Sequence, residues 1–372
     1  PNVFAPAGAE RQIEYGWDRQ NWFPWAASEQ QAARERVALF DMTSFGKFLI
    51  QGRDAEAELN RLAANQVAVP VGASVYTGLL NARGGYESDV TISRLSPTEF
   101  LLVTGSAQAV RDADWIRRNL RPEAHATLTD VTSAYSVLAV MGPKSRALLQ
   151  GLSRNPLDAD AFPFGAIRSI ELGQATMLAC RRTYVGELGW ELYVPTEFAA
   201  MVYDTLVDAG RAHDLKDAGY YAMDGLRLEK AYRAWGRELT PDHTPYEAGL
   251  GFAVKLDKGC DFIGRAALIE ARKSERKRAC IALVAADPEA PMAHGGELIL
   301  SDGKPVGEVT SAAYGATLGR VVMLGYVATG GAKADAAWLA GRRFSIDNAG
   351  RTIEVSASLK APLDPVNARV MT

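Results

Sequence analysis

The stretch GLRLEKAYRAWGRELTPDHTPYEAGLG, residues 225–251, lies between a longer N-terminal region and a shorter C-terminal region. Its first residues continue a helical pattern, and we predict a helix over 220–235 that ends near Gly236. Pro241 and Pro245 then break the chain. The stretch therefore predicts one long helix followed by an irregular connection.

The part behind this stretch has the pattern of a small β domain. A helix predicted over 262–272 runs into the basic sequence RKSERKR, residues 272–278, which is typical of a solvated connector. We place a domain boundary there, between a region 1–275 and a region 276–372. The strands expected beyond it are Cys280–Ala285, Glu297–Leu300, Gly307–Thr310, Val321–Val327 and Ile353–Leu359. Short strands with Gly-rich turns predict a small antiparallel barrel or sandwich.

The body before the stretch mixes helices and short strands without regular alternation. This pattern predicts an α+β fold with mixed or antiparallel sheets, because a doubly wound parallel sheet would alternate strand and helix strictly. At 372 residues, with 48% hydrophobic and 23% charged residues, the chain is long enough for two or three globular domains. We expect a folded enzyme.

Charge and composition exclude several classes of partner. The formal net charge of -3 gives no attraction to nucleic acid or anionic lipid, and no apolar stretch is long enough for a membrane span. We therefore expect no nucleic-acid or membrane partner and a cytoplasmic location. The three cysteines and four histidines are scattered, so we expect no metal. The sequence also has no Gly-rich dinucleotide or phosphate loop and no Gly-x-Ser-x-Gly elbow.

Two glycine turns each lead to a carboxylate. The first is GGYESD, residues 84–89, and the second is YVGELGWE, residues 184–191. A turn that enters a strand aims one acidic side chain, since strand side chains alternate between the two faces. In the first strand, Glu87 and Thr91 are expected on the same face as Asp89. The opposite face is expected to carry Tyr86, Ser88, Val90 and Ile92. A solvated Asp89 on a half-exposed strand is the alternative.

The second turn predicts a hairpin. Strands over 176–182 and 190–194 would place Glu191 and Tyr193 on one face, and Trp190 and Leu192 on the other. Glu191 would then be held by a rigid pair of strands.

The residues themselves carry a family resemblance. The 225–251 stretch, with KLDK at 255–258 and DFIGR at 261–265, resembles the folate-binding family of the glycine-cleavage T-protein, an aminomethyltransferase. It is most similar to the C-terminal folate half of dimethylglycine and sarcosine dehydrogenases. The likeness runs from about Asn21 to the end of the chain.

The resemblance implies a three-lobed cloverleaf around a channel for tetrahydrofolate, with two interleaved lobes in 1–275. The key acid of the family falls on Asp89, and its pterin-binding carboxylate falls on Glu191. Its folate-contacting Tyr and Thr fall on Tyr184 and Thr91. One position departs from the pattern: an Arg of T-proteins is Met223 here, which argues against the T-protein's own reaction on a lipoyl-bound group.

These residue types suit folate chemistry. A carboxylate accepts two hydrogen bonds, so Glu191 can bind the N–H edge of a pterin. Asp89 can accept the proton released when a folate nitrogen attacks an iminium carbon. The expected function is capture of a formaldehyde-level carbon from a demethylated amine, such as dimethylglycine or sarcosine, as 5,10-methylenetetrahydrofolate. FAD would reside only on a separate amine-oxidising domain, in cis or in trans.

Two alternatives within the superfamily stay open. One is a free-standing tetrahydrofolate-dependent demethylase that forms 5-methyltetrahydrofolate. The other is a non-catalytic folate-binding protein of iron-sulfur cluster maintenance, because such proteins carry a Lys-Gly-Cys motif that Lys258-Gly259-Cys260 matches. The residues after it follow the transferase pattern instead, so we expect Cys260 to be a small semi-buried residue.

Overall fold

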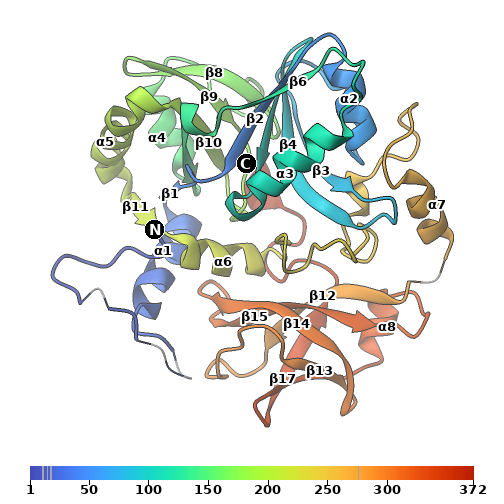
Figure 1. Cartoon of the computed structure of the whole chain (residues 1–372). Helices are drawn as coiled ribbons and strands as arrows, with labels where there is room; N and C mark the ends of the chain where they lie inside the picture. The colour runs from blue at the N-terminus through green and yellow to red at the C-terminus, as the bar shows by residue number, and fades with distance from the viewer. Residues whose placement is uncertain (11, 15, 17–18, 275) are drawn as a thin grey trace.

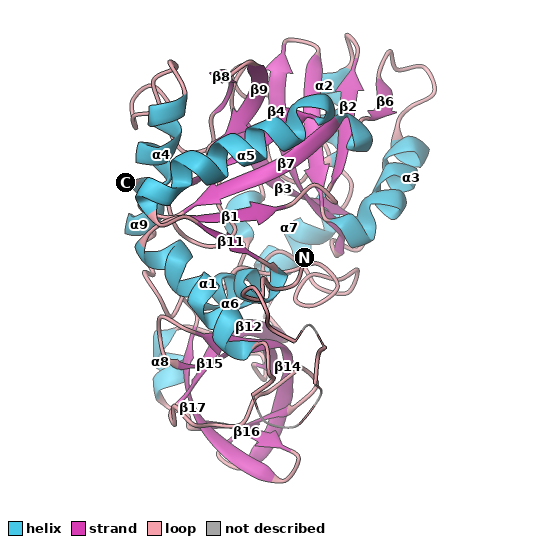
Figure 2. Cartoon of the chain, turned by 90° about the vertical axis from the view of Figure 1, so that its left-hand side faces the viewer, coloured by secondary structure: helices cyan, strands magenta, loops and turns pink. Residues whose placement is uncertain are grey.

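Three β-sheets, each the centre of one lobe, organise the chain (Figure 1). The computed structural model describes residues 1–10, 12–14, 16, 19–274 and 276–372. A six-stranded mixed sheet and a five-stranded antiparallel sheet lie together, and a closed six-stranded barrel lies below them in the views of Figures 1 and 2. The predicted α+β class with mixed and antiparallel sheets is confirmed.

The six-stranded sheet has the order β11-β1-β7-β10-β9-β8. Strand β1 runs parallel to β11, and the other neighbouring pairs are antiparallel. Its strands are β1 (Ala38–Asp41), β7 (Tyr135–Met141), β8 (Ile167–Leu172), β9 (Ala175–Cys180), β10 (Gly189–Pro195) and β11 (Lys216–Ala218). The chain leaves this sheet after β1 and returns to it at β7, so the sheet is built from two separated parts of the sequence.

The intervening part of the chain forms the five-stranded sheet, in the order β3-β4-β5-β2-β6. Its strands are β2 (Gly46–Gln51), β3 (Ser74–Leu80), β4 (Tyr86–Ser96), β5 (Glu99–Thr104) and β6 (Thr127–Asp130). Helices α2 (Ala55–Leu62) and α3 (Ala109–Asn119) cover its apolar face, where Leu59 and Ile116 join Val90 and Ile92 in one buried cluster.

The barrel closes in the order β12-β15-β14-β13-β16-β17. Its strands are β12 (Arg278–Ala285), β13 (Leu298–Ser301), β14 (Lys304–Gly315), β15 (Arg320–Ala328), β16 (Phe344–Asn348) and β17 (Arg351–Ser358). The five predicted strands are present, and the structure adds β16, which was not predicted. Closure leaves no unpaired sheet edge, which is the reason small antiparallel domains favour barrels.

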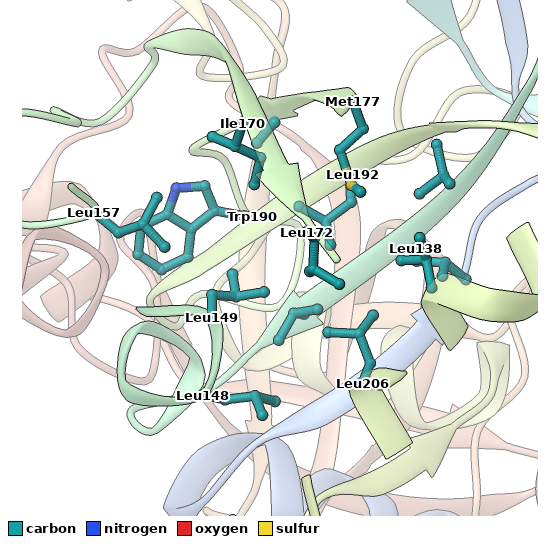
Figure 3. Close-up of a cluster of buried hydrophobic side chains, with 14 of the residues drawn as sticks. Leu138, Leu148, Leu149, Leu157, Ile170, Leu172, Met177, Trp190, Leu192 and Leu206 are labelled. Atoms are coloured by element: carbon teal, nitrogen blue, oxygen red, sulfur yellow. The ribbon is translucent and has the colours of Figure 1, made fainter. Parts of the chain in front are cut away.

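The remaining helices cover the sheets and connect the lobes. They are α1 (Phe23–Glu35), α4 (Ser145–Leu152), α5 (Ala199–Gly210), α6 (Tyr220–Glu229), α7 (Arg265–Lys273), α8 (Ala336–Ala340) and α9 (Ala368–Met371). Helices α4 and α5 pack on one face of the six-stranded sheet, where Leu148, Trp190 and Leu206 share a core cluster (Figure 3). Helix α6 contacts both α1 and barrel strand β14. No helix in the described part of the chain is long and apolar enough to cross a membrane.

The long helix predicted over 220–235 is wrong beyond Glu229. Helix α6 ends there, and Ala231 turns the chain with a φ of 51°. The carboxylate of Glu229 accepts hydrogen bonds from the backbone N–H groups of Thr317 and Leu318 between β14 and β15, and Lys230 pairs with Asp364 over 3.0 Å. These buried ionic contacts to the barrel and the C-terminal tail end the helix, although the helical pattern continues in the sequence.

Candidate functional site

Asp89 lies in the middle of β4, one strand in from the edge of the five-stranded sheet. Its side chain is half-buried, and the hydroxyl of Tyr76 on β3 donates to its Oδ2 over 3.0 Å. Burial raises the pKa of Asp89 to about 6, although hydrogen bonds from Tyr76 and Gln108 oppose the rise. Asp89 is therefore not the solvated surface residue of the alternative interpretation. It is a carboxyl whose proton affinity suits exchange near neutral pH.

A β-bulge changes the face on which Tyr86 lies. The β3–β4 register shifts between Leu79 and Leu80, so Leu80 pairs with Tyr86 and Gly78 pairs with Asp89. A Cβ added at Gly78 would come within 2.6 Å of the Tyr86 ring, so the ring lies on the Asp89 face of the sheet. The prediction that Tyr86 opposes Asp89 is wrong, because strict alternation fails at a bulge.

The same bulge turns Glu87 toward α3. Its carboxylate forms an ion pair with Arg111, so Glu87 does not join Asp89 as predicted. Ser88, Val90 and Ile92 keep the predicted opposite face, since Ser88 bonds to α3 and the two apolar side chains enter the core beneath that helix.

Glu191 lies in the middle of β10, where both neighbouring strands pair with it. The residue is 7% exposed, and its carboxylate accepts a 2.7 Å hydrogen bond from the hydroxyl of Tyr193. Burial raises the pKa of Glu191, while the positive charge of Arg182 opposes the rise. The predicted faces are confirmed. Tyr193 packs with Cys180 in a buried cluster on one face of the sheet, and Trp190 and Leu192 pack on the other face, in the core under α4 and α5.

Tyr184 and Thr91 are half-buried and lie on the Asp89 side of the site: the charge of Asp89 acts on Tyr184, and Thr91 is two residues along β4 from Asp89. The hydroxyl of Tyr184 donates to the carbonyl oxygen of Arg233 over 3.0 Å, and its ring stacks on Tyr232 with centroids 6.0 Å apart. Burial raises the pKa of Tyr184, and the charge of Asp89 adds to the rise. Thr91 is directly opposite Tyr76 in the β3–β4 register.

The two sheets meet at β3 and β9, the strands that pair with the carboxyl-bearing strands β4 and β10. Ser74, at the start of β3, forms a 3.4 Å hydrogen bond with the thiol of Cys180 at the end of β9. Cys180 in turn is directly opposite Glu191 in the β9–β10 register. Asp89 and Glu191 therefore stand on neighbouring lobes, joined through β3 and β9, and the two carboxyls do not bond to each other. The central channel stays a prediction.

Sequence reasoning missed three residues that act on the two carboxyls: Tyr76, Gln108 and Arg182. Tyr76 and Gln108 hydrogen-bond around Asp89, and Arg182 supplies a positive charge near Glu191. Tyr76 lies on the neighbouring strand, diagonally across from Asp89, and pairing of the strand before the first glycine turn with the strand after it was the signal that could have identified it. Gln108 lies on a separate element, so the sequence carried no such signal.

The Lys-Gly-Cys motif has a structural use here. The ammonium of Lys258 donates to the carbonyl oxygens of Asn60, Ala63 and Asn65, at and beyond the C-terminal end of α2, and burial lowers its pKa to about 8. Cys260 is exposed, so the prediction of a semi-buried thiol is wrong. The side chain of Lys258 points toward the end of α2, and Gly259 then turns the chain with a positive φ, so Cys260 lies at the surface. Within the described residues, no group of three or more His, Cys, Asp or Glu side chains could hold a metal.

Comparison with known proteins identifies the fold and the family. The family model for the GCVT N-terminal domain matches residues 2–258, and the glycine cleavage T-protein C-terminal barrel domain matches residues 276–364. The chain belongs to the glycine cleavage T-protein family. The family binds tetrahydrofolate, so the predicted enzyme class, a folate-dependent aminomethyltransferase-like protein, is confirmed.

Known relatives of the chain include transferases and dehydrogenases. An aminomethyltransferase of Shouchella clausii is 34% identical over 336 residues, which are 90% of this chain and 89% of that protein. Mitochondrial dimethylglycine dehydrogenase of Mus musculus is 39% identical over 332 residues, 88% of this chain but 38% of the dehydrogenase. The chain thus spans about two fifths of the length of that relative.

A solved structure confirms the cloverleaf fold. The glycine cleavage aminomethyltransferase T of Bartonella henselae superposes with a TM-score of 0.80 at 24% identity, covering 94% of this chain and 93% of that chain. The predicted T-protein architecture with its C-terminal barrel is therefore correct.

Met223 occupies the position at which the resemblance to T-proteins implies an Arg. Met223, on α6, is 5% exposed and packs in the same cluster as Tyr184 and Tyr193. A thioether at this place offers neither a positive charge nor a strong hydrogen-bond donor. The site therefore differs from the T-protein pattern in charge at one point close to the candidate residues.

Proposed function

We propose that the chain transfers a one-carbon unit at the formaldehyde level, released from a methylated amine such as dimethylglycine or sarcosine, to tetrahydrofolate. The folate supplies the nucleophilic nitrogens N5 and N10, and the product is 5,10-methylenetetrahydrofolate. The observation that carries the proposal is the environment of Asp89: a half-buried carboxyl, fixed by Tyr76, with a pKa raised by burial to about 6.

The donor set fits a reduced folate. Glu191 is a buried acceptor that the Tyr193 hydroxyl orients, and a pterin ring presents adjacent N–H donors to such a group. Tyr184 offers a flat aromatic surface that is already stacked on Tyr232. Thr91 lies across from Tyr76 and adds a hydroxyl near Asp89. We assign Glu191, Tyr184 and Thr91 to folate binding on this basis.

Asp89 holds and moves the proton in this proposal. As an anion it stabilises positive charge that develops on the attacking nitrogen, and it then accepts the proton of that nitrogen. Its raised pKa makes it a stronger base than an ordinary Asp while it remains largely ionised above pH 6. Binding of the folate by Glu191 keeps the reacting nitrogen at a fixed position, which lowers the entropic part of the barrier.

The name of one relative and the residue at position 223 support the proposed carbon donor. Mouse dimethylglycine dehydrogenase is named for a methylated amine, and Met223 removes the charge that T-proteins present at one point of the site. We therefore favour an iminium or formaldehyde-level donor, generated by a flavin amine-oxidising domain in cis or in trans, over a lipoyl-bound aminomethyl group.

The test is Asp89→Asn at saturating tetrahydrofolate. Loss of a general base lowers turnover by about 10² to 10⁴-fold, while folate affinity is expected to remain close to that of the parent. Mass spectrometry of the product distinguishes methylene from methyl transfer. Full turnover by Asp89→Asn, or a 5-methyl product, would contradict the proposal.

A further inference from the structure

A second buried carboxyl lies behind Asp89. Asp112, on α3, is 1% exposed and faces the side of β4 opposite to Asp89. Helix α3 lies against the five-stranded sheet (Figure 1), and its Ala113 and Ile116 pack in the core with Val90 and Ile92 of β4. No part of the proposed folate site requires a carboxylate in this apolar layer.

The hydrogen bonds around Asp112 favour its ionised form. Its Oδ2 accepts from the hydroxyl of Ser88 over 2.6 Å and from that of Thr104 over 2.5 Å. The amide Nε2 of Gln108 donates to both hydroxyl oxygens, over 2.9 Å and 3.0 Å. Because each hydroxyl already accepts from Gln108, its own proton is free to point at Asp112. The arrangement thus delivers two hydrogen bonds to one carboxylate oxygen.

The charge of Asp112 is only partly compensated. Its second oxygen, Oδ1, is buried and has no hydrogen-bond partner among the residues that the structure describes. The positive charge that acts on it from the same helix is Arg111, whose guanidinium is engaged by Glu87. Burial raises the pKa of Asp112, and the bonds from Ser88, Thr104 and Gln108 oppose that rise. Among the described residues, the carboxyl of Asp112 therefore has hydrogen-bond donors on one oxygen and no ion pair of its own.

The network reaches Asp89 directly. Ser88 precedes Asp89 in the chain, and Gln108 Nε2 also approaches the backbone carbonyl oxygen of Asp89 at 3.4 Å. We propose that Asp112 is a positioning residue for Asp89: it fixes β4 through Ser88 and Gln108, and it holds a second negative charge behind the reacting carboxyl. This inference rests on the proposed function, because it gives Asp112 a part in the same proton transfer.

The electrostatic surroundings of Asp89 support this assignment. The hydroxyls of Tyr76 on β3, Tyr86 on β4 and Tyr184 before β10 face it as neutral groups, and Asp112 acts on it from α3 as a like charge. Burial is the largest cause of the raised pKa of Asp89, and Asp112 adds to it. Two nearby carboxyls disfavour each other's ionisation, so Asp112 makes Asp89 a stronger base.

The experiment is a carboxyl titration by ¹³C NMR of the full chain labelled with ¹³C and ¹⁵N, with the signals of Asp89 and Asp112 assigned in the parent through their connectivity to the backbone. In Asp112→Asn the midpoint of Asp89 is expected to fall by about half a unit or more. The matched control is Asp114→Asn, on the same helix but paired with Arg118 at the surface, which is expected to leave the midpoint unchanged.

Two results would overturn the inference: an unchanged Asp89 midpoint in Asp112→Asn, or an Asp112 that stays protonated throughout the titration of Asp89 in the parent. The second measurement needs no variant, so it decides the question even if Asp112→Asn does not fold. Both midpoints are read without turnover. An active Asp89→Asn would therefore refute the proposed function separately, whereas these titrations test Asp112 alone.

Discussion

The hydroxyl of Tyr76 donates to Oδ2 of Asp89 over 3.0 Å, from the strand next to the one that carries the carboxyl. The bond is stronger to the carboxylate than to the neutral acid, so it lowers the pKa of Asp89 against the effect of burial. Tyr76 and burial together set the pH at which Asp89 becomes a base.

Tyr76→Phe is therefore expected to raise the pKa of Asp89 above its value of about 6. Because the base must be ionised, the acidic limb of the plot of kcat against pH should move to higher pH in Tyr76→Phe. In Asp112→Asn the pKa of Asp89 is expected to fall, so the same limb should move to lower pH. Measured kcat between pH 5 and 8 checks this. Tyr203→Phe, which removes a 3.0 Å bond to Asp217 far from the site, should leave the limb in place. A limb that moves to lower pH in Tyr76→Phe would refute the role of the bond.

Gly78→Ala tests the bulge that brings Tyr86 beside Asp89. The new Cβ would lie 2.6 Å from the Tyr86 ring, and the ring is fully buried, so either the ring or the strand must shift. We expect a destabilisation of about 1 to 3 kcal/mol from overpacking, together with lower turnover. Thermal unfolding and kcat measure the two effects.

The comparison for this variant is Gly151→Ala, at an exposed helical glycine with open space around its added Cβ. That change is expected to be neutral or to stabilise by up to about 1 kcal/mol. Equal unfolding temperatures and equal kcat for Gly78→Ala and Gly151→Ala would mean that the Tyr86 ring does not require a glycine at position 78.

A buried ionic cluster between the lobes predicts a large effect on stability. Arg34 on α1 pairs with Glu187 over 3.1 Å and with Glu229 over 2.9 Å, and the three side chains are at most 3% exposed. Arg34→Met leaves Glu229 buried without its cation, and it leaves Glu187 with only Arg369, whose side chain is 39% exposed. The free energy of unfolding should fall by about 3 to 5 kcal/mol, measured by urea denaturation at pH 7.

The pH dependence of this loss has a definite sign. Burial raises the pKa of Glu187, and Arg34 opposes the rise. Without Arg34, the folded protein binds a proton at Glu187 more tightly than the unfolded chain does, so the deficit should shrink as pH falls toward 5. Arg211→Met, which removes an exposed pair with Asp208, should change the urea midpoint little at either pH. A deficit that grows on acidification would contradict this account.

The sequence predicted the family and the α+β fold, and it placed Asp89 and Glu191 in strands that follow glycine turns. It failed where tertiary contacts override a local pattern. The helix through Trp235 ends at Glu229 because Glu229 and Lys230 are held by other lobes. Tyr86 lies on the Asp89 face because of a bulge that alternation cannot reveal. The boundary between residues 275 and 276 and the cytoplasmic location stay predictions.

The most direct test of the account is calorimetric titration of tetrahydrofolate into the parent, Glu191→Gln and Asp89→Asn, with Glu197→Gln at an exposed position as the control. Loss of the charged acceptor should weaken binding to Glu191→Gln by about tenfold to a hundredfold, since hydrogen bonds to charged groups contribute about 1.5 to 3 kcal/mol. Asp89→Asn should bind like the parent. Equal affinity of the parent and Glu191→Gln would contradict the folate site.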